Sequence, residues 1–185
     1  MRRLDAETIQ RGFTIIELMV TVVVLAVVAS LSAPAMRNFI TEQRLKAAFS
    51  DFQRGLNLAR AEAIRRNARV TFAAADCANF SSGWKVFVET GLNADRCHNG
   101  AEPLVMRGDP IDNAIRVTWV NADGNQPYLM FTPTGTVALS NGAVGASRFS
   151  LDVPSSPAIQ ARTLCINFYG RTRPLLGSTN CGTMG

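Results

Sequence analysis

The sequence predicts an α+β protein in which one long amino-terminal hydrophobic helix packs on a carboxy-terminal, antiparallel, sandwich-like β-domain. Residues 18–36 form an uncharged, largely apolar run of 19 residues. Residues 45–63 then repeat apolar side chains at helical spacing, and short β-rich segments divided by turn sequences follow. The chain has 185 residues and a formal net charge of +5, and this length favours one domain with an appendage over a multidomain enzyme.

The apolar run is long enough to cross a membrane as a helix. At about 1.5 Å per residue it spans about 28 Å, close to the thickness of a bilayer core. Arg2, Arg3 and Arg11 precede the run and favour a cytoplasmic amino end by the positive-inside tendency, which places residues 37–185 outside the cytoplasmic membrane. A secretory signal peptide is the competing interpretation, but its apolar region is shorter, at about 7–15 residues.

Glu17 is awkward for both a plain anchor and a signal peptide. It lies inside the start of the apolar stretch, where an ionisable group is costly. Cleavage between Gly12 and Phe13 would give Phe13 a free amino group close to the Glu17 carboxylate of the same or a neighbouring chain. Charge pairing would then hold copies of the helix in register. A plain transmembrane anchor remains the alternative.

Residues 12–18, GFTIIEL, followed by an apolar helix that carries Pro34, resemble the class III signal of type IV pilins and type II secretion pseudopilins. The resemblance implies that a prepilin peptidase removes residues 1–12, that Phe13 is N-methylated, and that the helix assembles with other pilins through Glu17. Proline removes a helical hydrogen bond and kinks the chain. Pro34 is therefore expected either to let the helix bend or melt on assembly, as the resemblance implies, or to mark a tolerated kink at the membrane exit.

The helix is expected to continue past the membrane to about Arg66. Its apolar side chains recur at spacings of four and three residues, which is typical of a stripe that packs onto a sheet of the same chain. The chain thus divides into a leader (1–12), a membrane and assembly half of the helix (13–36), an amphipathic half (37–67) and a β-rich globular domain (68–185). The stripe consists of Leu45, Phe49, Phe52, Leu56, Ala59 and Ala63.

Beyond Asn67 the helical period disappears and turn chemistry separates β-rich segments. Residues 90–114 are rich in glycine, asparagine and proline and are expected to form a long loop. Credible turns lie at 121–124, 133–135 and 140–142. The expected strands are residues 69–75, 84–89, 115–120, 128–132, 136–139, 148–153 and 162–168.

Four cysteines favour two disulfides if this part of the chain faces an oxidising space. Three connectivities are possible. We favour Cys77 with Cys97 and Cys165 with Cys181, because each pair closes a short local loop, while four buried thiols remain the alternative. A zinc site that uses His98 fits no usual ligand spacing.

The chain also resembles the GspH/FimT branch of the pilin superfamily. The resemblance rests on residues 59–64 (ARAEAI), 131–135 (FTPTG) and 165–173 (CINFYGRTR), and residues 76–114 carry no distinctive motif. It implies a low-abundance minor pilin or pseudopilin that primes assembly and lies at or near the filament tip.

Catalytic chemistry is not evident in the sequence. The single histidine, His98, falls in the expected loop and is interpreted as a solvated side chain, and no glycine-rich phosphate-binding signature precedes a helix. We therefore expect a protein that is not an enzyme and that needs no cofactor or metal.

The run from Gly170 to Arg173, GRTR, is the sharpest remaining signal. In a turn that continues into a strand, alternation places Arg171 and Arg173 on one side, where two guanidinium groups can engage successive phosphates. Arg148 and Arg162 are expected to extend this track. The run also resembles the GRxR motif of FimT-type minor pilins, which implies capture of double-stranded DNA in natural transformation.

Two functions therefore stay open. One is a minor type IV pilin of the FimT/FimU kind that primes or caps a pilus and binds DNA. The other is a GspH-like minor pseudopilin of a type II secretion system without DNA binding. Both imply a single-pass protein of the bacterial inner membrane, with a cytoplasmic amino terminus and a periplasmic domain, that later enters a pilus or pseudopilus. A membrane-anchored, disulfide-bonded binding domain without a filament role is the generic alternative.

Overall fold

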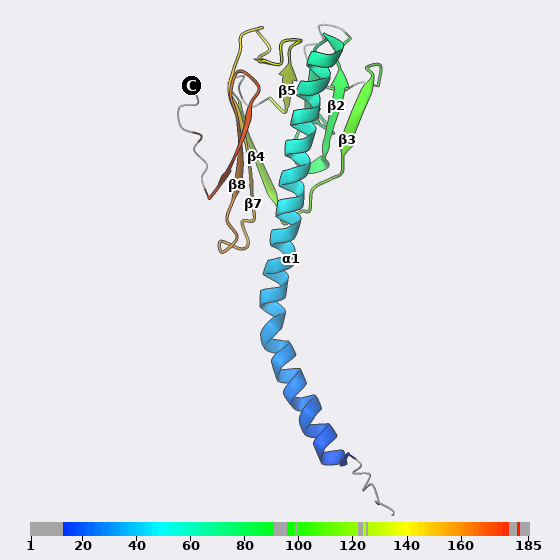
Figure 1. Cartoon of the computed structure of the whole chain (residues 1–185), viewed down its shortest axis with the longest axis vertical. Helices are drawn as coiled ribbons and strands as arrows, with labels where there is room; N and C mark the ends of the chain where they lie inside the picture. Colours follow the sequence, from blue (N-terminus) through cyan, green and yellow to red (C-terminus); the bar gives the residue numbers. More distant parts are fainter. Residues whose placement is uncertain are drawn as a thin grey trace, which may run out of the picture. The chain divides into compact units, whose positions relative to one another are not determined.

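The computed structural model describes residues 13–90, 96–98, 100–121, 124, 126–177 and 181, except for the side chains of residues 32–35. The chain forms two compact units, Met1–Phe39 and Ile40–Gly185. Helix α1 (Ile15–Arg66) begins in the first unit and ends in the second (Figure 1).

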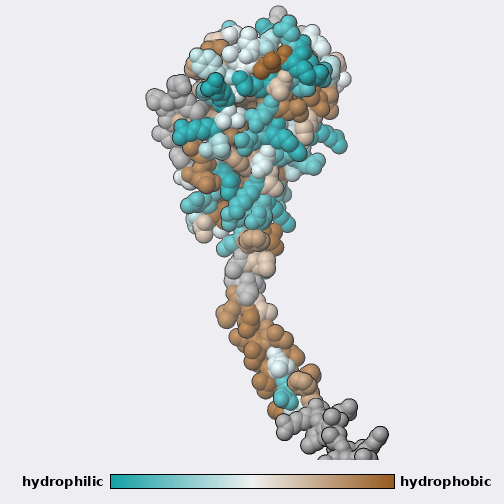
Figure 2. All heavy atoms as spheres, viewed as in Figure 1, coloured by the Kyte–Doolittle hydropathy of each residue, from teal (hydrophilic) through white to brown (hydrophobic). Residues whose placement is uncertain are grey.

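The described part of the first unit is helical from Ile15, and its large apolar side chains are all at least 54% exposed, with Phe13 at 83%. Figure 2 shows one face of this apolar surface. Among the described residues, no single helix is long and apolar enough to span a membrane by itself. Ile15–Leu31 and Met36–Arg66, which meet at a bend, satisfy the length and composition requirement only as a pair. Pro34 falls in the break between them, and its side chain lies outside the described residues.

In the second unit, α1 buries the expected stripe: each of its six apolar side chains is at most 5% exposed. The helix ends at Arg66, as predicted, because Asn67 adopts a left-handed conformation with φ of +50°. The N–H of Ala68 donates to the Ala63 carbonyl and the N–H of Asn67 donates to the Ile64 carbonyl. These two bonds form a Schellman cap, in which asparagine takes the place usually held by glycine.

Two antiparallel sheets pack against this half of the helix (Figure 1). The first has the order β3-β2-β1-β5-β6, with a short 3-10 helix, η1 (Phe80–Ser82), between β1 and β2. The second has the order β4-β7-β8-β9. Their bounds are β1 (Val70–Ala74), β2 (Trp84–Val88), β3 (Leu104–Gly108), β4 (Arg116–Asn121), β5 (Tyr128–Phe131), β6 (Val137–Ala138), β7 (Ser147–Asp152), β8 (Arg162–Ile166) and β9 (Thr172–Leu176).

One core lies between the helix and the inner faces of both sheets. The ring of Phe149 in β7 contacts Phe52 of α1 edge-on at 5.2 Å and Phe80 of η1 at 4.9 Å. Gly55 lets the sheet approach the helix, because a Cβ atom there would lie 2.8 Å from atoms of the Phe72 and Trp84 rings. The predicted α+β class and the packing of the helix on an antiparallel, two-sheet domain are confirmed.

The structure corrects the strand assignment at two places. Residues 90–114 are not all loop, because β3 forms the edge of the first sheet beside β2. The second addition, β9, was not among the expected strands. The β9 strand contains Pro174, which has no N–H to donate to a neighbouring strand. The proline is tolerated there because β9 lies at the edge of the second sheet.

Both disulfides join the pairs that the sequence favours. Cys77 is bonded to Cys97, with their Cα atoms 5.6 Å apart, and Cys165 is bonded to Cys181, with their Cα atoms 5.7 Å apart. Both Cα distances are usual for disulfides. The first bond ties the segment after β2 to the end of β1, and the second ties Cys181 to β8.

Candidate functional site

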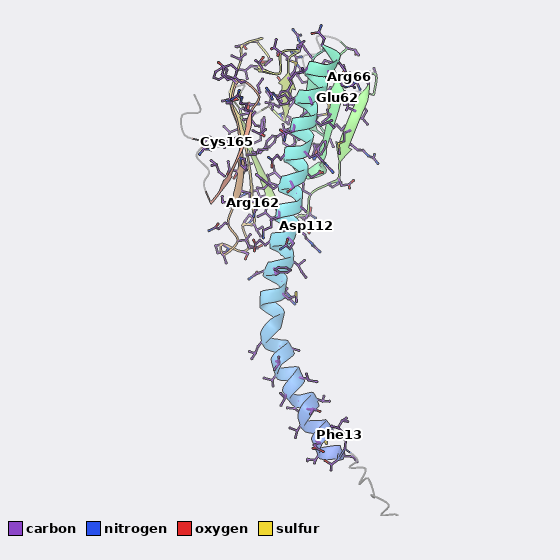
Figure 3. All side chains as sticks on the ribbon, in the orientation of Figure 1. Phe13, Glu62, Arg66, Asp112, Arg162 and Cys165 are labelled. Carbon is purple, nitrogen blue, oxygen red and sulfur yellow. A yellow bond between two sulfur atoms is a disulfide. The ribbon has the colours of Figure 1, made fainter. Side chains whose placement is uncertain are left out.

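The helix start coincides with the expected processing site. The Glu17 carboxylate accepts hydrogen bonds from the N–H and the hydroxyl of Thr14, each at 3.2 Å, and the Thr14 hydroxyl accepts from the Glu17 N–H at 3.2 Å. This reciprocal arrangement is a capping box with Thr14 as the N-cap. Phe13 immediately precedes the cap (Figure 3), while Gly12 lies outside the described residues.

The GRTR run begins inside a tight hairpin turn between β8 and β9. The Asn167 N–H donates to the Arg171 carbonyl at 3.1 Å, and the Gly170 N–H donates to the Asn167 carbonyl at 2.8 Å. Gly170 has φ of +72°. This pattern is that of a type I turn closed by a left-handed glycine, so the sequence NFYGR fixes the place where the strand leading to Arg173 starts.

The turn between β5 and β6 is built in the same way. The Thr132 N–H donates to the Thr136 carbonyl at 2.9 Å, the Gly135 N–H donates to the Thr132 carbonyl at 2.8 Å, and Gly135 has φ of +77°. The hydroxyl of Thr132 is within hydrogen-bond distance of the hydroxyls of Thr134 at 2.8 Å and Thr136 at 2.7 Å. The sequence TPTGT therefore forms a second, internally bonded turn.

These two turns, one from each sheet, touch each other and the helix. A Cβ atom on Gly170 would lie 2.3 Å from the Gly135 carbonyl oxygen and 3.0 Å from atoms of the Arg60 side chain. The Arg60 Nε donates to the same carbonyl oxygen at 3.0 Å, and the Val137 N–H donates to the Phe168 carbonyl at 2.9 Å. Three segments that are distant in the sequence are thereby locked together.

A surface hollow of about 410 Å³ opens where they meet. The sequence singled out only Arg171 among the side chains that line it. Arg60 and Thr134 belong to motifs that carry the family resemblance, but nothing in their spacing shows that they converge. The hollow is lined by Arg60, Thr134, Thr136, Asn167, Tyr169 and Arg171.

Arg148 and Arg173 lie on the outer face of the second sheet. Each is directly opposite Cys165 in the strand register, so the three side chains share one face. The neighbours of Cys165 in β8, Leu164 and Ile166, are fully buried in the core, so that shared face points away from the core. Arg171 and Arg173 are exposed, and among the described residues neither guanidinium is in an ion pair.

Arg162 does not extend this track, contrary to the expectation. Arg162 is three residues before Cys165 in β8, so its side chain points to the opposite, inner face of the sheet. There its guanidinium lies 5.9 Å from the centre of the Phe49 ring of α1 (Figure 3). The pKa of Glu42 is lowered chiefly by Lys46, with a smaller effect of Arg162. Arg162 thus belongs to the contact between sheet and helix.

Other cations are neutralised within the domain. Arg65 and Arg66 both bond to Glu62 near the helix end, and they lower the pKa of Glu62 to about 2 (Figure 3).

His98 is half-buried, whereas the sequence predicts a solvated side chain. Its ring packs on Phe87 with the ring centres 5.3 Å apart, and its Nε2 lies 3.1 Å from the Glu102 carbonyl oxygen. No cluster of metal-ligating side chains occurs in the part of the chain that the structure describes.

Comparisons with solved structures bear on the fold. The type IV minor pilin FimU of Pseudomonas aeruginosa (strain PAO1) is 19% identical, with a TM-score of 0.56, over 77% of this chain and 98% of the FimU chain. The minor pseudopilin EpsH of the Vibrio cholerae type 2 secretion system is 13% identical, with a TM-score of 0.50, over 72% of this chain and 97% of the EpsH chain. At these identities the likeness shows a shared fold. A search of curated proteins gives no match.

The sequence itself matches two families. Residues 8–33 match the prokaryotic N-terminal methylation motif, which implies processing by prepilin peptidase and assembly with other pilins. Residues 48–170, about two thirds of the chain, match the family described as type II transport protein GspH. The matched proteins are pilins and pseudopilins rather than enzymes. The chain therefore belongs to the GspH family and carries the N-terminal methylation motif.

Proposed function

We propose that this protein is a minor type IV pilin that primes or caps a pilus and captures DNA on the arginines of its second sheet. The observation that carries the proposal is that Arg171 and Arg173 are both exposed and outside any ion pair among the described residues, with Arg173 across Cys165 from Arg148 on the outer face. Guanidinium groups in this arrangement suit phosphate oxygens.

The mechanism is electrostatic and independent of base sequence. Arg171 leaves a hydrogen-bonded turn and Arg173 follows it on the strand, so the backbone that carries the two guanidinium groups needs little ordering when they meet a phosphate backbone. Binding releases condensed counterions and therefore weakens as salt rises. Phosphate contacts of this kind position a strand without reading its bases, as capture of DNA of any sequence requires.

The amino-terminal unit supplies membrane retention and assembly. Prepilin peptidase removes residues 1–12, the new amino group of Phe13 becomes methylated, and the protein waits in the inner membrane with its domain in the periplasm. The new ammonium group then pairs with Glu17 of a neighbouring subunit. The capping box supports this role, because it begins the helix immediately after Phe13 and leaves the new terminus outside the helix.

A second candidate is a minor pseudopilin of a type II secretion system. The description of the matched family as a type II transport protein favours it, as does the fold shared with EpsH. In that case the outer-face arginines contact neighbouring subunits or solvent and have no role with DNA.

Duplex binding across a salt series distinguishes the two candidates. The full chain, held in a non-ionic detergent, is titrated into a labelled duplex of about 30 base pairs between about 50 and 200 mM salt. We expect affinity to fall as salt rises. An Arg171→Ala/Arg173→Ala variant should bind more weakly, and its plot of log affinity against log salt concentration should be less steep by about two phosphate contacts.

Arg107→Ala is the matched control, because Arg107 is also exposed but lies on β3, at the edge of the other sheet. It is expected to bind as the unaltered protein does. Equal binding by the double variant and the unaltered protein, or no binding by either, would reject DNA capture at this face and leave the pseudopilin candidate.

A further inference from the structure

Two surface hollows of similar size in the second unit differ in charge. One, of about 420 Å³ beside α1 and β3, carries three arginines and three aspartates, and Arg44–Asp112 and Arg54–Asp51 are already ion pairs. The hollow at the paired turns, of about 410 Å³, carries Arg60 and Arg171 and no acidic side chain. Its positive charge is not balanced by its own lining, so an anionic ligand suits it.

The rest of the lining offers hydrogen bonds and one flat apolar surface. Thr134, Thr136 and Asn167 supply hydroxyl and amide groups. Tyr169 is 52% exposed, and its ring rests on Phe168 with the ring centres 3.9 Å apart. The two ring planes are tilted by 40°, and an exposed tyrosine ring held by a second aromatic ring is a surface on which a planar group can stack.

The hollow is preorganised. Arg60 is tied to the Gly135 carbonyl oxygen through Nε, and the Arg171 N–H donates to the Asn167 side-chain oxygen at 3.0 Å. The two glycine turns are closed by their own hydrogen bonds and by the contact between Gly170 and Gly135. A ligand therefore meets groups whose backbone is already fixed, which lowers the entropy cost of binding.

The volume indicates the size of the ligand. Pockets for small organic ligands measure about 300–1,000 Å³, so a single phosphate would leave most of this hollow unfilled, whereas a nucleotide would occupy it. We propose that the hollow takes one unpaired nucleotide of a DNA strand, with its phosphate at Arg60 and Arg171 and its base stacked on Tyr169. This inference rests on the DNA binding proposed above and adds the form of DNA that is held.

A base inside a DNA duplex is already stacked and paired, so it cannot lie on Tyr169 without leaving the double helix. Arg148 and Arg173 on the outer face accept any phosphate backbone, but the stacking position on Tyr169 accepts only a single strand, an overhang or a frayed end. The protein is therefore expected to hold strand ends more firmly than the interior of a duplex.

Tyr169→Leu tests the stacking platform in the full chain in detergent. The probes are a single-stranded oligonucleotide of about 20 residues, and the same sequence as a blunt duplex, at equal salt. We expect Tyr169→Leu to lose about tenfold in affinity for the single strand and less than about twofold for the duplex, and Tyr169→Phe to keep single-strand binding. A fluorescent adenine analogue in the single strand should be quenched by the unaltered protein and not by Tyr169→Leu.

The outcomes separate this inference from the function on which it rests. If both probes bind and Tyr169→Leu weakens both equally or neither, the nucleotide site is rejected while DNA capture by Arg171 and Arg173 stands. If neither probe binds the unaltered protein, DNA capture itself fails. Thermal unfolding and intact disulfides in each variant show that any loss is not a loss of fold.

Discussion

The backbone of Gly170 lies against the carbonyl oxygen of Gly135, so closely that a Cβ atom at position 170 would be 2.3 Å from that oxygen. The contact joins the β8–β9 turn to the β5–β6 turn and brings Arg60 and Arg171 to one hollow. The turn that presents the arginines therefore depends on the absence of a side chain at position 170.

Gly170→Ala is expected to destabilise the domain by about 3 kcal/mol, from the left-handed backbone together with the clash against a fixed carbonyl. Gly142→Ala is the matched control. Gly142 closes the same kind of turn with φ of +81° but has open space around it. The Gly142→Ala variant should therefore lose only about 1 kcal/mol of folding stability. Chemical denaturation measures both, and equal losses would show that the contact at Gly135 is unimportant.

Glu17→Gln separates helix capping from charge pairing. Glutamine also completes a capping box, so the start of the helix should survive, but it carries no charge to pair with the amino group of Phe13. We expect membrane levels of the protein to be unchanged and its recovery in sheared filaments to fall steeply. Immunoblots of both fractions measure this, and normal recovery in filaments would exclude charge pairing.

Gly12→Leu is expected to block removal of the leader. Helix α1 begins at Ile15 and its cap is Thr14, so the bond after residue 12 precedes the helix. Intact mass measurements should show an uncleaved chain for the variant, and for the unaltered protein a chain that begins at a methylated Phe13. A cleaved variant would contradict the processing signal.

Acid should destabilise the domain partly through Glu62. Arg65 and Arg66 lower its pKa from 4.5 to about 2, so the folded state binds this proton less readily than the unfolded chain does. The stabilising contribution is complete above about pH 4.5 and is lost as the pH falls from there to about 2. Denaturation at several pH values should show a shallower loss for Glu62→Gln, and an identical pH profile would contradict this role.

The Cys165–Cys181 bond is expected to stabilise the domain by about 3 kcal/mol, because it closes a loop of 16 residues in the unfolded chain. A Cys165→Ser/Cys181→Ser variant should unfold at lower denaturant concentration and should bind duplex DNA less well, because Cys165 lies directly opposite Arg148 and Arg173. Unchanged DNA binding in a folded variant would show that the arginines are held without the bond.

Local patterns predicted most of the fold. The stripe from Leu45 to Ala63 repeats every three or four residues and the repeat stops beyond Asn67, so the second half of the helix and its end near Arg66 followed from neighbouring residues. The edge strands were harder. The β9 strand contains Pro174, and β3 lies in a segment rich in turn residues, so both depend on pairing with the preceding strand, β8 or β2, rather than on their own propensities.

The candidate site was predictable only in part. Alternation along the chain predicts that Arg171 and Arg173 share one face. It does not show which face of each strand is buried in the core and which is exposed. The sequence therefore could not show that Arg162 contacts Phe49 instead of joining Arg148. The hollow combines residues 60, 134 and 171, and no local pattern reports a meeting of three segments so far apart in the sequence.

The core also has a mechanical consequence. Within Ile40–Gly185 the helix is one wall of the core, since Leu45, Phe52 and Leu56 are almost fully enclosed by the sheets. A pull on the helix along its axis loads every one of these contacts at once in shear, instead of opening them one after another. The domain is thus built to pass an axial load from the helix into both sheets without the core opening at one end first.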